Sequence, residues 1–216
     1  MAIKAVIFDM DGVVVDSMPV FEKTDREFLK NKGIILSKED SEKIKRLSGL
    51  RMQEIMIYIK DRFGLEGSIE DLISERRKIG FRMVGKELNT VDGFAKFVAS
   101  IRKKYKTALT TSASPIYIEE VEKKLSILKN FDCVITGKDV KNGKPDPEPY
   151  LVTCKKLRVK PGEAVVIEDA PVGIKSAKAA GCICIGLTTS FEKELKEADY
   201  IAHNYKEVEK IIEELK

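Results

Sequence analysis

Two acidic pairs are the residues of this chain best suited to chemistry. Asp9 and Asp11 directly follow an apolar run in the segment VIFDMDGVVVDS, and Gly12 comes next. Glu168 and Asp169 follow a second apolar run, AVVI. Carboxylates held close together repel one another unless a cation lies among them, and clustered carboxylate oxygens suit Mg²⁺. The two pairs therefore predict a magnesium site if the fold brings them together.

A hydroxyl-rich segment and one lysine add groups that bind anions. Thr111 and Ser112 end the run YKTALTTS, and Ser114 followed by Pro115 predicts that a helix starts there. A helix N-terminus preceded by a hydroxyl is an anion site, and we favour Thr111 over Ser112 as the main hydroxyl. Lys144 lies in NGKPDPEPY, where prolines stiffen the chain and limit the entropic cost of holding the ammonium. Together with magnesium, these groups predict a phosphoryl-transfer site.

Five short apolar runs have the length and β-branched content of buried parallel strands. They are AIKAVIF, YKTALTT, FDCVIT, AVVIED and CICIGL. Segments of helical period separate the last four, and this alternation is typical of a doubly wound α/β sheet. Ligands of such sheets bind beyond the carboxyl ends of the strands, where the acidic pairs, the hydroxyls and Lys144 stand. The pattern therefore predicts one site at one edge of the sheet.

The stretch from residue 17 to residue 88 departs from this alternation and predicts four consecutive helices. Asp16, just before it, could mark the hinge into this stretch or start the first helix, and we favour the start of the helix. We therefore predict an all-helical cap domain, residues 17–88, inserted into a Rossmann-like catalytic core formed by residues 1–16 and 89–216. The boundaries between the helices of the predicted cap are indicated by Gly33, by Ser37 with Asp40, by Gly64, and by Ser68 with Asp71.

Composition and charge exclude several classes of protein. The formal net charge of the 216 residues is +4, and basic and acidic side chains are interleaved, so a nucleic-acid partner is not indicated. No apolar run has the length of a membrane span, and no signal-peptide pattern precedes the first strand, so a cytoplasmic location is expected. The four cysteines form no C-x-x-C pair, and this argues against zinc. The sequence does not indicate an oligomeric state.

Asp9 and Asp11 are expected to act on one substrate, because residues i and i+2 at a strand end face the same side. Asp9, held by Mg²⁺ and therefore ionised, would attack phosphorus and form an aspartyl-phosphate. Asp11 would protonate the leaving oxygen and then take a proton from the water that hydrolyses the intermediate. Gly12 would allow a sharp turn where a side chain would crowd the phosphate.

The motifs FDMDGVVVDS, LTTS, GKPDP and VIEDAPVGIKSAKAAG, taken in this order, resemble those of the haloacid dehalogenase-like hydrolases. The resemblance is to the branch that contains β-phosphoglucomutase and the phosphoglycolate-type phosphatases, and it covers the whole core. It implies a Rossmann-like core and a cap that closes over the substrate. It also implies roles for particular residues: Asp9 as nucleophile, Asp11 as acid/base with its backbone carbonyl on Mg²⁺, Thr111 and Lys144 on the phosphoryl group, Asp169 as a metal ligand, and Glu168 as a ligand directly or through water.

The predicted cap offers candidate substrate contacts. Gly49 and Arg51 lie in LSGLR between two of its helices, and similar loops in the family reach into the active site. The sequence favours a substrate contact for Arg51 only slightly over an exposed position on the surface. Arg77, together with Arg76 and Lys78, could also face the cleft, although a solvated helix face is the better interpretation for most of them.

The function favoured is a Mg²⁺-dependent phosphatase acting on a small phosphorylated metabolite, with phosphoglycolate, sugar phosphates and nucleotides all open. The alternative is a sugar-phosphate mutase, but β-phosphoglucomutases usually carry a His where Phe21 stands and an Arg where Met52 stands. A phospho-accepting signalling domain is a third alternative. It would need an Asp at the end of the third strand, where Thr136 and Gly137 stand, and Asp139 lies further into the loop.

Overall fold

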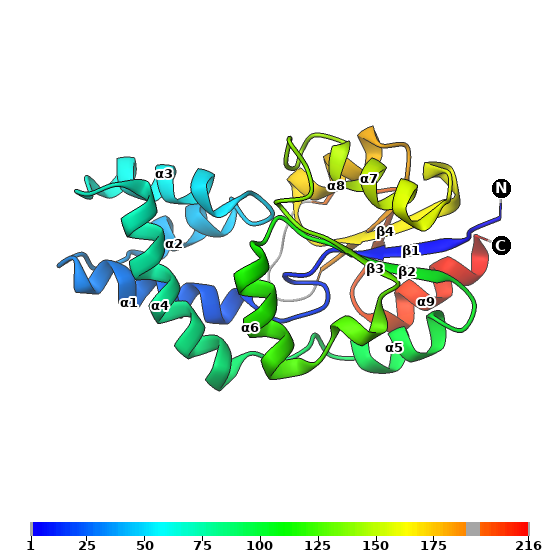
Figure 1. The fold of residues 1–216 in the computed structure, drawn as a ribbon, viewed down its shortest axis with the longest axis horizontal. Helices are drawn as coiled ribbons and strands as arrows, with labels where there is room; N and C mark the ends of the chain where they lie inside the picture. Colours follow the sequence, from blue (N-terminus) through cyan, green and yellow to red (C-terminus); the bar gives the residue numbers. More distant parts are fainter. Residues whose placement is uncertain (1, 189–194, 216) are drawn as a thin grey trace.

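The computed structural model describes residues 2–188 and 195–215, and within them the core is a six-stranded parallel sheet (Figure 1). The strand order is β3-β2-β1-β4-β5-β6, and each neighbouring pair is parallel. The predicted doubly wound fold is therefore confirmed, although β6 was not predicted. The order switches direction between β1 and β4, where a crevice opens at the carboxyl ends. The strands are β1 (Ala5–Phe8), β2 (Lys106–Thr110), β3 (Cys133–Ile135), β4 (Ala164–Glu168), β5 (Ile183–Leu187) and β6 (Tyr200–Ala202).

Helices cover both faces of this sheet (Figure 1). Val6 and Phe8 of β1 pack into the apolar cluster of one face, while Ala5 and Ile7 pack into the cluster of the other. Burial on both faces explains why the strands are continuous apolar runs in the sequence. The first face carries α5 (Phe94–Ile101), α6 (Pro115–Leu125) and α9 (Tyr205–Glu214), and the second carries α7 (Glu148–Leu157) and α8 (Pro171–Ala179). Short 3₁₀ helices, η1 (Leu128–Asn130) and η2 (Pro161–Glu163), precede β3 and β4.

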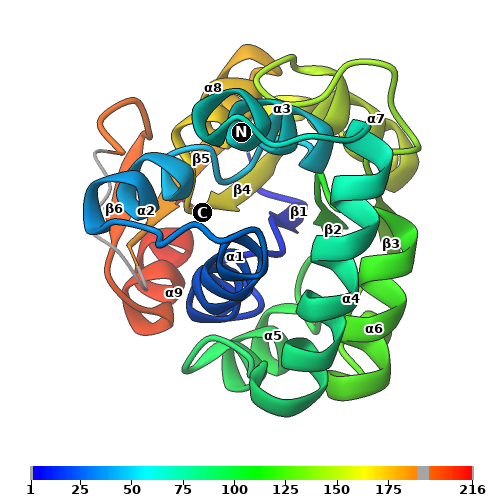
Figure 2. The same cartoon turned by 90° about the vertical axis from the view of Figure 1, so that its left-hand side faces the viewer.

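The inserted segment folds into helices joined by loops (Figures 1 and 2). It has an apolar cluster of its own. Ser37 and Ser68 accept hydrogen bonds from the first-turn N–H groups of Asp40 and Asp71, so both cap helix N-termini as predicted. Gly64, with a φ of 63°, ends α3 in the left-handed conformation that favours glycine. The helices are α1 (Met18–Asn31), α2 (Lys38–Lys45), α3 (Met52–Phe63) and α4 (Ile69–Glu87).

The two ends of the helical segment lie side by side. The Asp16 N–H donates to the Asn89 carbonyl, and Val15 forms an antiparallel bridge with Thr90. The expectation that Asp16 starts the next helix is wrong, because α1 begins at Met18 and Asp16 pairs with the returning chain instead. The helical segment thus leaves and rejoins the core at one place.

Among the described helices α4 is the longest, at 19 residues. Neither it nor any other helix of the described ranges combines the length and apolarity that crossing a bilayer requires.

Candidate active site

The loops that follow β1, β2 and β4 meet at the point where the strand order switches. Met10 is fully buried in the apolar core, so Asp9 and Asp11 on either side of it both face the cavity beyond the strand ends. Gly12 has a φ of 80°, and a Cβ on it would lie 2.1 Å from Asp169 Oδ2. The absence of a side chain at Gly12 therefore lets the loop after β1 approach the carboxylate that follows β4.

Lys144 is the positive charge at the centre of this site. Its Nζ donates to Asp9 Oδ1 at 2.5 Å and to Glu168 Oε1, and the side chain is almost wholly buried. The two carboxylates strongly raise the Lys144 pKa and outweigh the opposing effect of burial, so the amine is charged. Lys144 therefore ties the end of β1 to the end of β4.

Glu168 is fully buried and has a partner on each oxygen. Oε1 accepts from the Tyr150 hydroxyl at 2.6 Å as well as from Lys144, and Oε2 accepts from the N–H groups of Asp169 and Ala170. A Cβ on Gly173, in the first turn of α8, would lie 1.8 Å from Oε1. These contacts fix Glu168 in place and make it a support of Lys144.

The donor set fits a hard divalent cation. Asp9, Glu168 and Asp169 each place one carboxylate oxygen within 4.8 Å of the others, and all three are buried. Among the described residues, the carboxyl groups of these three and of Asp11 face the single ammonium of Lys144. Excess negative charge in a buried site is costly, and a divalent ion with oxygen ligands would offset it.

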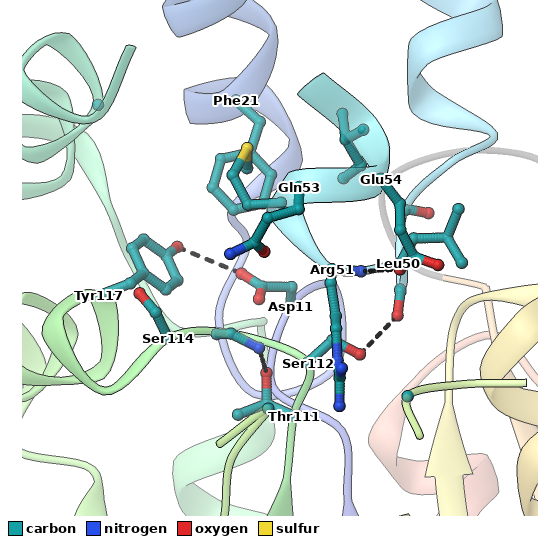
Figure 3. Close-up of a pocket in the computed structure, with 18 of the residues that line it drawn as sticks. Asp11, Phe21, Leu50, Arg51, Gln53, Glu54, Thr111, Ser112, Ser114 and Tyr117 are labelled. Carbon is teal, nitrogen blue, oxygen red and sulfur yellow. Dashed lines mark hydrogen bonds between the residues drawn. The ribbon is translucent and has the colours of Figure 1, made fainter. Parts of the chain in front are cut away.

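The protonation of Asp9 and Asp11 reflects this crowding. Burial raises the Asp9 pKa well above its usual value even though the Lys144 ammonium opposes the rise. Burial also raises the Asp11 pKa to about 6, against the effects of the Ser17 and Tyr117 hydroxyls. The Tyr117 hydroxyl donates to Asp11 Oδ1 at 3.2 Å (Figure 3). Ser17 Oγ makes no hydrogen bond of normal geometry with the described residues. A carboxyl group that titrates near 6 suits general acid and base chemistry near neutral pH.

Asp11→Asn is expected to stabilise the metal-free protein at high pH. Folding raises the Asp11 pKa to about 6, so the protonated carboxyl group is favoured in the folded protein. The contribution of Asp11 to the free energy of unfolding is therefore fully present below the ordinary pKa of an aspartate and is lost as pH rises through 6. Ionised Asp11 then costs the folded state about 3 kcal/mol, which asparagine avoids. Urea unfolding in EDTA should show a gain for the variant that is larger at pH 8 than at pH 5. An equal gain at both values would contradict the raised pKa.

Lys144→Met is expected to lower the free energy of unfolding by about 3–5 kcal/mol and to impair turnover. The substitution leaves Asp9 and Glu168 buried without their shared cation. Urea unfolding of both proteins measures the loss. The matched control is Lys123→Met, which breaks an exposed ion pair with Glu120 and should cost at most about 1 kcal/mol. Similar losses in the two variants would show that the buried network is not important for stability.

The two candidate hydroxyls after β2 have different partners. Thr111 Oγ1 accepts from the Ala113 N–H at 3.0 Å, so its own proton can be donated to a ligand. The Ser112 hydroxyl donates to the Gly49 carbonyl at 2.7 Å and thus joins the core to the loop between α2 and α3 (Figure 3). These contacts support Thr111 as the hydroxyl for the phosphoryl group.

The loop that carries Gly49 and Arg51 rests on the core. The Arg51 guanidinium donates to the carbonyls of Val140 and Lys141, at 2.9 and 3.2 Å. These bonds direct Arg51 to a core loop, so they favour a docking role over the substrate contact considered from the sequence. Gly49 lines the cavity and contributes its carbonyl to Ser112.

A cavity of about 1010 Å³ lies between the strand ends and the helical segment. Arg77 lines it and is half-buried. Arg76 also lines it but is buried and bonds Asp25 of α1 at 2.6 Å, so the solvated helix face expected for this stretch is wrong for Arg76, whereas Lys78 is exposed. The wall formed by the helices is rich in apolar side chains, among them Phe21, Leu50, Met52, Ile73 and Phe81.

Sequence patterns did not single out Tyr117 or Tyr150. Tyr150 follows the GKPDP motif on α7, so proximity to Lys144 was the one available signal. Tyr117 is in the first turn of α6, but only the rotation of that helix brings its hydroxyl to Asp11.

Comparison with known proteins identifies relatives along nearly the whole chain. The family model described as haloacid dehalogenase-like hydrolase matches residues 6–187. A phosphorylated carbohydrates phosphatase from Thermotoga maritima is 35% identical over 182 residues, 82% of each chain. A validoxylamine A 7'-phosphate phosphatase from Streptomyces hygroscopicus subsp. limoneus is 31% identical over 207 residues, 95% of each chain. The solved structure of a "putative beta-phosphoglucomutase" from Thermotoga maritima is similar with a TM-score of 0.80 at 28% identity, covering 98% of this chain and 99% of that one.

Proposed function

The chain belongs to the haloacid dehalogenase-like hydrolases and is a phosphate ester hydrolase, and we propose that it is a Mg²⁺-dependent phosphatase that acts through an aspartyl-phosphate on Asp9. The observation that carries the proposal is the position of the Asp9 carboxylate. It faces the cavity at the end of β1, bonds Lys144, and lies with Asp169 in one carboxylate cluster.

In the proposed reaction, Thr111 and Lys144 bind the phosphoryl group of the substrate. A carboxylate oxygen of Asp9 attacks phosphorus, and Asp11 gives its proton to the leaving oxygen as the ester bond breaks. Asp11 then takes a proton from water, whose oxygen attacks phosphorus and releases Asp9 with inorganic phosphate. A divalent cation held by Asp9 and Asp169 would neutralise phosphoryl charge and favour the ionised form of Asp9.

Residues 17–88 form the proposed cap domain, with residues 1–16 and 89–216 as the catalytic core. Two observations support this division: the separate apolar cluster of α1–α4, and the single junction at Asp16 and Asn89. The cap loop meets the core through the Ser112 and Arg51 hydrogen bonds, so the helices roof the cavity above Asp9. Side chains of this roof, with Arg77 among them, would select the leaving group.

We propose a small phosphorylated metabolite as the substrate, with phosphorylated carbohydrates first among the candidates because the name of the Thermotoga maritima relative specifies them. The mutase named for the similar solved structure is a second candidate. Against it, an apolar ring, Phe21, packs on Tyr117 beside Asp11 where a mutase would usually carry a His. Membership of the hydrolase family argues against a phospho-accepting signalling domain, and Asp139 bonds Thr136 within its own loop.

A phosphate-release screen over sugar phosphates, polyol phosphates, phosphoglycolate and nucleotides tests the proposal. Repeated turnover of at least one ester is expected. Conversion of β-glucose 1-phosphate is assayed in parallel, and isomerisation faster than phosphate release would favour the mutase. A single phosphorylation event without turnover would overturn both.

A further inference from the structure

Tyr117 was not predicted from the sequence, and its hydroxyl donates a hydrogen bond to the proposed acid/base. Its hydroxyl lies 3.2 Å from Asp11 Oδ1, and both residues line the cavity (Figure 3). A hydrogen bond of this length is long for an O–H donor, but catalytic contacts are often long before substrate binds. The bond engages Oδ1, one of the two oxygens of the Asp11 carboxyl group.

Packing from the helical segment holds the Tyr117 ring in place. The ring centroid lies 5.8 Å from that of Phe21 on α1, with an interplanar angle of 46°. The Arg76 guanidinium lies 5.7 Å from the same Phe21 ring and bonds Asp25. The orientation of the tyrosine, and with it that of Asp11, is therefore set by contacts that cross from the core to α1 and α4.

We propose that Tyr117 is a positioning residue that orients Asp11 for proton transfer to the leaving oxygen. The inference rests on the proposed function. In the first half of the reaction, the bond from phosphorus to the leaving oxygen breaks as the bond to Asp9 forms, and the Asp11 proton passes to that oxygen. The demand for this proton depends on the leaving group: an alkoxide needs it, whereas a stable phenolate such as p-nitrophenolate leaves without it.

Tyr117→Phe provides the test, because phenylalanine keeps the ring against Phe21 and removes only the hydroxyl. The second-order constant kcat/KM is compared for an alkyl phosphate accepted in the screen and for p-nitrophenyl phosphate, since it reports the steps up to transfer to Asp9. We expect kcat/KM for the alkyl ester to fall about 10- to 100-fold and that for the aryl ester to fall less than about 3-fold. Across a series of aryl phosphates, the dependence of log kcat/KM on leaving-group pKa should become steeper.

Tyr205→Phe is the matched control. Tyr205 is a buried tyrosine whose hydroxyl donates to the Val13 carbonyl at 2.7 Å, within the core and outside the cavity lining. Loss of the Tyr205 hydroxyl should change kcat/KM for both substrates by the same factor. An equal fall in kcat/KM for both substrates in Tyr117→Phe, or no fall for either, would overturn the positioning role. Turnover by the wild type would in that case leave the proposed function standing. Absence of phosphate release from every ester by the wild type would overturn both.

Discussion

Asp9→Asn is expected to reduce phosphate release by at least about 10⁴-fold while the protein stays folded. An amide is a far poorer nucleophile than a carboxylate and cannot form the aspartyl-phosphate. The fold should survive, because the substitution removes one of several crowded carboxyl groups and Lys144 keeps its bond to Glu168. Steady-state phosphate release and thermal unfolding measure the two effects separately.

Asp139→Asn is the matched control for this substitution. Asp139 also follows a strand, but its carboxylate bonds the Thr136 N–H and hydroxyl inside its own loop. Activity should stay within a few-fold of the wild type.

Acid-quenched enzyme analysed by mass spectrometry should carry the phosphoryl group on the peptide that contains Asp9. Appreciable turnover by folded Asp9→Asn, or a label on the peptide of Asp139, would remove Asp9 from its role.

The sequence predicted those parts of the molecule that depend on local pattern. Asp9, Thr111 and Asp169 each follow an apolar run, and parallel strands necessarily bring such ends to one edge. The helix boundaries at Ser37 and Ser68 were equally local, since a capping side chain bonds an N–H group three residues away. β6 was missed because Tyr200–Ala202 is too short for an alternation to be recognised.

Other parts of the site depend on contacts between distant segments. Arg51 is directed by the carbonyls of Val140 and Lys141, and backbone carbonyls carry no sequence signal. A solvated helix face was expected for most of Arg76, Arg77 and Lys78, but α1 presents Asp25 to Arg76 and the pair is buried. In both cases the partner is set by how the helices pack, which one residue pattern does not encode.

Glu168 shows how the contacts refine a role that the motif suggested. The resemblance implied Asp169 as a metal ligand and Glu168 as a ligand directly or through water. In the structure, one member is satisfied by Tyr150, Lys144 and two backbone N–H groups, and the other lies against Gly12. These contacts support a division of roles in the proposed site, in which Glu168 holds Lys144 and Asp169 is the proposed ligand of the cation.

Removal of divalent metal is expected to lower phosphate release by at least about 10³-fold, and Mg²⁺ should restore it. Without a cation, burial and three neighbouring carboxyl groups all raise the Asp9 pKa, and only the Lys144 ammonium lowers it among the main causes. The ionised form of Asp9, the proposed nucleophile, is therefore disfavoured. Binding of Mg²⁺ to the folded protein should also raise the free energy of unfolding by about 2–3 kcal/mol near saturation, an effect independent of turnover. Thermal unfolding with and without Mg²⁺ measures it, with Asp169→Asn expected to lose the gain and Asp139→Asn to keep it. Full activity in metal-free buffer, or an undiminished gain in Asp169→Asn, would show that these carboxylates do not form a magnesium site.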